Sequence, residues 1–209
     1  CMYRHGIEAI KYFPEQPLPY ALSGIALMMQ KQFAEALPLF EKGVELTDDK
    51  PELRSQFYSY LADCYYNLDS VERAFKMFDE VLKINPNDIL VLNNYAYYLS
   101  VERRDLDKAE EMSYKTVKAE PNNATYLDTY AWILFEKGNY AEARIYIDDA
   151  IKNTKPEEES SVVFEHCGDI YFMTGDVEGA LKYWKKALEL GTESKTLKQK
   201  IEKKKYIAE

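Results

Sequence analysis

Apolar residues recur along most of the chain at the three- and four-residue spacing that an amphipathic helix requires. One such stretch contains Tyr58, Leu61 and Tyr65, and the next begins at Ala74 after a short polar break. A similar break at residues 136–139 contains a glycine, which is typical of a tight turn. The pattern therefore predicts an all-α protein in which helices follow one another in pairs.

A second pattern accompanies the first. Five times, a small residue stands about twelve positions ahead of an alanine, and these pairs recur roughly every 34 to 38 residues. The pairs are Gly24–Ala36, Ala62–Ala74, Ala96–Ala109, Ala131–Ala143 and Gly168–Ala180. Two antiparallel helices approach closely only where one offers a small side chain to the other. Five pairs in register predict an α-solenoid of stacked helical hairpins rather than one globular core.

At these positions the chain resembles the tetratricopeptide repeat family. The fourth copy reads Leu127, Tyr130, Ala131 and Leu134 in its first helix, then Ala143, Ile147 and Ala150 in its second. Closing prolines stand at Pro86 and Pro121, whereas the third copy has one extra turn residue and Ser113 in place of an aromatic residue. The resemblance implies a right-handed α-solenoid in a single domain, with repeats at residues 17–50, 55–88, 89–123, 124–157 and 161–194.

Both ends of the chain carry partial versions of the repeat. Residues 1–16 resemble a partial repeat, because Gly6 to Phe13 look like a second helix without its first helix. This half-repeat and the style of the copies favour the C-terminal part of a longer bacterial protein. Residues 195–209 are expected to form a capping helix whose lysines, between Lys195 and Lys205, face solvent. An acidic partner or a lipid surface for these lysines is the alternative.

Composition and charge exclude two classes of function. The net charge of −9 argues against nucleic-acid binding, which depends on lysine and arginine to neutralise phosphates. No apolar run approaches the ~20 residues of a membrane span. The compartment stays open: cytoplasmic, or periplasmic if a signal or lipoprotein segment precedes the chain. Cys1 could begin a mature lipoprotein, but a helical pattern follows at once, so a remnant of cleavage or cloning is favoured.

Reactive side chains form no catalytic, cofactor-binding or metal-binding constellation in the sequence. The two histidines, His5 and His166, have no partner at metal-ligand spacing. Cys64 and Cys167 fall in separate repeats, and we interpret each as a small buried apolar side chain. Asn139, with an acidic residue three positions later, predicts only a capped helix start. We therefore expect no enzymatic activity and no cofactor.

In the family that the chain resembles, the first helices line a groove that holds a protein or peptide partner. Carried over by register, the groove residues are Asp63, Tyr66, Asn67, Asn93, Tyr97, Asp128, Trp132, Phe135, Glu165, Asp169 and Phe172. Trp132 is the expected anchor for a bound segment, whereas Tyr97 and Phe172 could instead fill gaps between repeats. The four carboxylates in this set would repel an acidic peptide and favour a basic or aromatic one.

The leading hypothesis is a non-catalytic scaffold that binds a peptide or protein segment in this groove. One alternative is a self-associating structural module, a homodimer in which the N-terminal half-repeat and the apolar face of Ile25, Met28 and Met29 pair with a second copy. The other is the non-catalytic arm of a larger enzyme or of a cell-envelope lipoprotein. No feature of the sequence identifies the partner.

Overall fold

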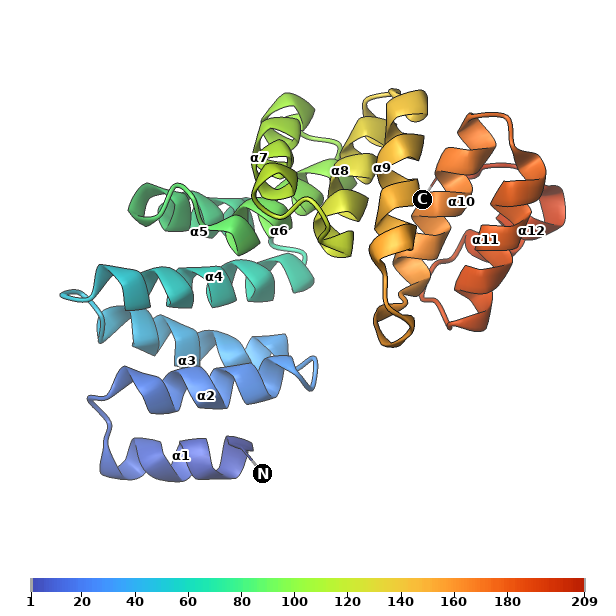
Figure 1. The fold of residues 1–209 in the computed structure, drawn as a ribbon. Coiled ribbons are helices and arrows are strands. Elements are labelled where there is room, and N and C mark those ends of the chain that lie inside the picture. The colour runs from blue at the N-terminus through green and yellow to red at the C-terminus, as the bar shows by residue number, and fades with distance from the viewer. Residues whose placement is uncertain (1, 209) are drawn as a thin grey trace. The chain divides into compact units, whose positions relative to one another are not determined.

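The structure, a computed structural model, describes residues 2–208 and is built from helices without strands over that range (Figure 1). The helices are α1 (Met2–Tyr12), α2 (Pro17–Met28), α3 (Phe33–Glu45), α4 (Pro51–Asn67), α5 (Val71–Ile84), α6 (Ile89–Val101), α7 (Leu106–Ala119), α8 (Ala124–Glu136), α9 (Tyr140–Asn153), α10 (Ser161–Met173), α11 (Val177–Glu189) and α12 (Leu197–Lys203). The all-α prediction is confirmed. None of the described helices is both long and apolar enough to span a bilayer.

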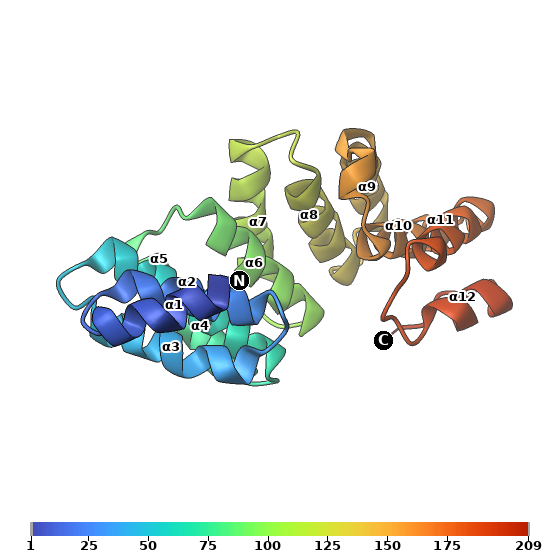
Figure 2. The same cartoon turned by 90° about the horizontal axis from the view of Figure 1, so that it is seen from below.

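The chain divides into two compact units, Cys1–Val91 and Leu92–Glu209, and the boundary falls within α6. In the first unit, α1 packs on α2, α2 on α3, α3 on α4 and α4 on α5. In the second unit, α7 packs on α8, α8 on α9, α9 on α10, α10 on α11 and α11 on α12 (Figure 2). Each of these helices therefore buries its apolar side against its neighbours in the chain, as stacked hairpins do.

The first helices of the five hairpins, α2, α4, α6, α8 and α10, end in the same backbone turn. Beyond each helix an N–H donates to the carbonyl five residues earlier, from Gln32 to Leu27, Ser70 to Tyr65, Arg104 to Leu99, Asn139 to Leu134 and Asp176 to Tyr171, at 2.8 or 2.9 Å. The residue before each donor has a left-handed backbone: Lys31, Asp69, Arg103, Gly138 and Gly175. This turn reverses the chain and sets the second helix antiparallel to the first.

Two of the small repeat residues lie directly under an aromatic side chain of the second helix. A Cβ added at Gly168 would lie 2.2 Å from Trp184 Cδ1, and one added at Gly24 would lie 2.4 Å from Phe40 Cε1. Trp184 and Phe40 are fully buried. Glycine at these two positions therefore leaves the space that the aromatic ring occupies between the paired helices.

The N-terminal helix α1 begins at Met2, earlier than the expected start at Gly6, and ends at Tyr12. It packs on α2, where Gly6 lies against Ser23. Cys1, for which we considered a lipoprotein start and a remnant of cleavage or cloning, lies outside the described residues.

The predicted cap at the start of α9 is wrong. Asn139 precedes this helix, but its side chain makes no capping hydrogen bond. Side-chain caps occur instead at the starts of α8, α10 and α11, where Asn123, Ser160 and Asp176 accept hydrogen bonds from backbone N–H groups.

Candidate partner-binding face

The predicted groove residues of the second unit lie on its first helices, α6, α8 and α10. Tyr97 lies on α6, Asp128 and Trp132 on α8, and Glu165 and Asp169 on α10. We call the surface that these five side chains define the first-helix face. The three carboxylates are buried, whereas the two aromatic side chains are partly exposed. The face therefore offers aromatic surface to solvent and keeps its carboxylates covered.

A stack of rings runs across the first-helix face. The ring centroids of Trp132 and His166 lie 4.0 Å apart at an interplanar angle of 14°, and those of Trp132 and Phe135 lie 4.7 Å apart at 13°. Tyr97 reaches the same imidazole, with 6.3 Å between ring centroids. Since these side chains come from α6, α8 and α10, the stack joins three successive first helices.

The imidazole of His166 is also in hydrogen-bond contact with one of the predicted groove carboxylates. Its Nδ1 lies 2.9 Å from Asp128 Oδ1, and both side chains are buried. Burial alone would lower the pKa of His166, but the carboxylates of Asp128, Asp169 and Glu165 outweigh it, so the pKa of His166 is raised above its usual 6.5. The imidazole of His166 is therefore held next to Trp132 in a site that favours its positive charge.

The other two carboxylates of the face bind a lysine of the same chain. Lys200 Nζ lies 2.8 Å from Glu165 Oε1 and 2.8 Å from Asp169 Oδ2. Lys200 is 2% exposed, so it departs from the solvent-facing lysine cluster that we expected in this segment. Glu165 also accepts from Ser194 Oγ, and Asp169 accepts from Trp184 Nε1. Each buried carboxylate thus has two donors.

Burial nevertheless has the largest effect on the pKa of Asp169. It raises the pKa of Asp169 to about 6, although the ammonium of Lys200 and the indole N–H of Trp184 both lower it. The electrostatic stabilisation by Lys200 therefore offsets only part of the desolvation of this carboxylate.

The chain beyond α12 turns back across the second unit. Figure 2 shows this segment running from α12 back beneath α10. Its Tyr206 packs edge-on against Phe135 of α8, with 5.5 Å between ring centroids, and lies 5.4 Å from Lys200 Nζ. Burial raises the pKa of Tyr206 to about 12. Lys200 therefore covers the carboxylates of Glu165 and Asp169 on α10, and Tyr206 covers the Phe135 end of the aromatic stack.

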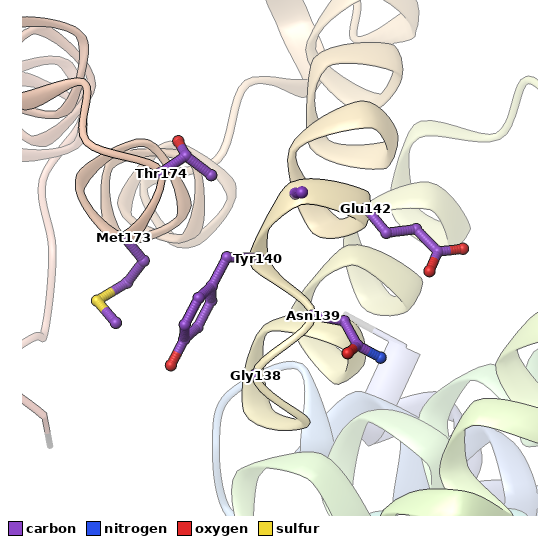
Figure 3. A pocket seen from close by; sticks show the side chains of 7 residues that line it. Gly138, Asn139, Tyr140, Glu142, Met173 and Thr174 are labelled. Atoms are coloured by element: carbon purple, nitrogen blue, oxygen red, sulfur yellow. The ribbon is translucent and has the colours of Figure 1, made fainter.

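An open pocket of about 580 Å³ lies beside this stack, between the α8–α9 turn and the end of α10. It is lined by residues 138–142 together with Met173 and Thr174. Figure 3 shows the side chains of Tyr140 and Met173 lying next to each other there. Tyr140 packs on Phe135, with 5.3 Å between ring centroids. The pocket is therefore a continuation of the aromatic surface, and it carries no group of reactive side chains.

Comparison with known proteins places the fold in a family. Two models of the tetratricopeptide repeat family match the chain, over residues 27–93 and 124–155. Over these two stretches the chain belongs to the tetratricopeptide repeat family. Tetratricopeptide repeat proteins are protein-interaction scaffolds and are generally non-catalytic.

Individual relatives agree with this assignment. A tetratricopeptide-repeat-containing protein of Pseudomonas aeruginosa is 28% identical over 142 residues, which are 68% of this chain and 23% of that protein. A thermophilic tetratricopeptide repeat protein of Thermus thermophilus has a TM-score of 0.69 at 16% identity, covering 90% of this chain and 98% of that one. YrrB, described as having an unusual peptide-binding site, has a TM-score of 0.63 at 19% identity, covering 95% and 97%. The chain spans about a quarter of the length of the curated relatives that it matches.

The remaining predicted groove residues have different surroundings. Asp63, Tyr66 and Asn67 lie on α4 in the first unit, where the Asn67 amide donates to the Asp63 carbonyl. Since they belong to the other compact unit, a groove that continues across both units stays a prediction. Asn93 on α6 is buried, and its Oδ1 accepts no hydrogen bond from the described residues. Phe172 stacks on Trp184 within the last tetratricopeptide hairpin, with 5.9 Å between centroids.

Three residues of the site were not predicted: His166, Lys200 and Tyr206. The repeat register gives a hint of His166. Glu165 stands three residues before Gly168, just as Asp128 stands three residues before Ala131, so both lie at the same groove position, and His166 directly follows Glu165. For Lys200 and Tyr206 the sequence offers only a lysine-rich stretch, which is equally typical of a solvated surface.

Among the described residues, no group of three histidine, cysteine or acidic side chains is arranged to hold a metal ion. Cys64 and Cys167 are buried, and burial raises the pKa of both thiols.

Proposed function

We propose that the first-helix face binds a segment of another protein, and that this segment carries a lysine or arginine together with a large aromatic side chain. This proposal specifies the scaffold function that the family has in general. The face supplies both kinds of contact: rings for stacking and carboxylates for a cation.

The observation that carries the proposal is the environment of Trp132. Its indole is partly exposed although it stacks on both His166 and Phe135, and Asp128 lies one helical turn earlier on α8. Tryptophan side chains of this kind are frequent anchors in protein interfaces, because they bury much surface and lose little conformational freedom. Since two rings already stack on the indole, a partner ring would pack against the exposed edge of Trp132.

Charge supports a basic partner rather than an acidic one. The chain carries a net charge of −9, and the carboxylates of the face already bind the ammonium of Lys200 and the imidazole of His166, whose pKa is raised. An acidic segment would be repelled both at long range and at the face. YrrB supports the principle that a fold of this kind can bind a peptide, since its description names a peptide-binding site.

A peptide array tests the proposal. Basic–aromatic peptides of about fifteen residues, with acidic–aromatic and basic–aliphatic sets as controls, are screened against the intact chain, and the affinities of the hits are measured by fluorescence anisotropy. We expect Trp132→Ala to weaken the hits by about thirtyfold, which corresponds to the ~2 kcal/mol of an interface hot spot. Binding should also weaken as the ionic strength rises.

Ile145→Ala is the matched control, since Ile145 is an exposed apolar side chain on α9 rather than on a first helix. It should leave binding unchanged. Equal losses in the two variants, or hits without basic residues, would contradict the assignment of the face.

A further inference from the structure

We infer that residues 194–206 are an internal ligand of the first-helix face, and that a partner segment of the proposed kind must displace them. The inference rests on the proposed function and deepens it, because the internal ligand shows how a lysine and an aromatic ring fit this surface. The partner segment would therefore place its aromatic residue six positions after its basic residue, as in Lys200 and Tyr206.

Lys200 is held as a bound ligand would be, on a helix that is itself anchored by Leu197, which is fully buried against Phe164 and Trp184. Its ammonium lies between Glu165 and Asp169, which stand one turn apart on α10, at 2.8 Å from each. Ser194 adds a hydrogen bond to Glu165, also at 2.8 Å. All three charged side chains are nearly inaccessible, so an incoming basic residue can reach the carboxylates only when Lys200 leaves.

The backbone after Lys200 explains how Tyr206 reaches the same face. The Lys205 N–H donates to the Lys200 carbonyl at 3.2 Å, and Lys204 has a φ of 50°, in the left-handed region. The first helices of the five hairpins end in this turn, and a second helix follows each of them. After α12 no helix follows within the described residues, and the turn instead sends Tyr206 toward Phe135.

Displacement sets the affinity that a partner shows. The internal ligand is tethered, so its effective concentration at the face is high, and a free segment with the same contacts competes poorly against it. The apparent dissociation constant of the partner is its intrinsic value divided by the fraction of chains in which the internal ligand has left the face. Changes in the internal ligand should therefore change partner affinity even where the partner never contacts the altered residue.

The first experiment separates the internal ligand from the face. A labelled peptide of residues 194–208 is titrated by anisotropy against the full chain and against a chain that ends at Glu193. We expect binding to the shortened chain and none to the full chain. In the peptide, Lys200→Gln and Tyr206→Ala should each weaken binding at least tenfold. A shortened chain that retains its helical circular dichroism but does not bind the peptide would overturn the inference.

The second experiment keeps the full chain and so does not depend on the folding of the shortened one. Lys204→Gly should hold the internal ligand more tightly, because glycine adopts the left-handed backbone at lower cost than lysine. Tyr206→Ala should loosen it, because the contact with Phe135 is lost. Hydrogen exchange of the Lys205 amide should slow about threefold to tenfold in the first variant and accelerate in the second.

The same two variants connect the internal ligand to the partner. A basic–aromatic peptide from the array should bind Tyr206→Ala more tightly than the natural chain, and Lys204→Gly more weakly. If array peptides bind all three chains equally, the internal ligand does not compete and the inference fails, while the proposed function stands. If no array peptide binds the shortened chain or the Tyr206→Ala chain, but the 194–208 peptide binds the shortened chain, the docking of the internal ligand stands and the proposed partner binding fails.

Discussion

Replacing Gly168 by alanine should destabilise the second unit, although alanine is the better helix former. The added methyl carbon would lie 2.2 Å from Cδ1 and 2.4 Å from Nε1 of Trp184, closer than real side-chain contacts allow. The indole is fully buried, and its Nε1 donates a 2.9 Å hydrogen bond to Asp169. The ring therefore has no free space to move into without disturbing that bond.

Three contributions set the size of the effect. Alanine is favoured over glycine within a helix by ~1 kcal/mol. Forcing an extra methyl group into a packed core costs ~1–3 kcal/mol, and disturbing a hydrogen bond to a charged acceptor costs ~1.5–3 kcal/mol. The net expectation for Gly168→Ala is a loss of about 1.5–5 kcal/mol in the free energy of unfolding.

The fourth repeat supplies a matched control. There Ala131 occupies the position of Gly168, and Ile147 occupies that of Trp184. Both are fully buried, so an alanine–isoleucine pair is compatible with this hairpin. In a Trp184→Ile background the methyl group of Gly168→Ala meets no indole, and the substitution should stabilise the chain by up to ~1 kcal/mol.

Urea unfolding followed by far-ultraviolet circular dichroism measures all four chains of this double-mutant cycle. The expected result is a change of sign between the two backgrounds. A loss of the same size with and without Trp184 would refute the reasoning, because the indole could not then be the cause.

Two further outcomes follow from buried titratable groups. The pKa of His166 is raised in the fold, because the nearby carboxylates outweigh the opposing effect of burial. The contribution of His166 to the stability of the fold is therefore complete below its unfolded pKa of about 6.5. It is lost as the pH rises through the folded pKa. In urea unfolding, His166→Gln should thus cost more stability at pH 6 than at pH 9, and a larger cost at pH 9 would contradict the raised pKa. Burial raises the pKa of Cys64 to about 12 and also raises that of Cys167, so both thiols should resist iodoacetamide at pH 8 in the native chain and react in urea, as peptide mapping by mass spectrometry would show. Alkylation of either thiol under native conditions would show that its burial is incomplete.

The hairpins could be predicted because their cause is local and repeated. The small residue at Gly168 or Ala131 and the alanine that follows recur in register, and close packing of two helices demands that pattern. The same reasoning does not reach Asn139, because its residue type suits a cap while its backbone ψ of 58° lies outside the extended region that capping residues prefer.

The chemistry of the face could be predicted only in part. Register placed Asp128, Glu165 and Asp169 on first helices, and the excess of carboxylates indicated a cationic ligand. It could not indicate that the chain supplies cations of its own. Lys200 lies 35 residues after Glu165 in a stretch of similar lysines, and nothing local distinguishes it from those that face solvent.

The two tryptophans of the chain are Trp132 and Trp184, and both lie in the unit Leu92–Glu209. Intrinsic tryptophan emission therefore reports on this unit alone, while far-ultraviolet circular dichroism reports on the helices of both. Heating curves that coincide by the two signals would mean that the units melt together. Separate curves would give the stability of each unit without any label or truncation.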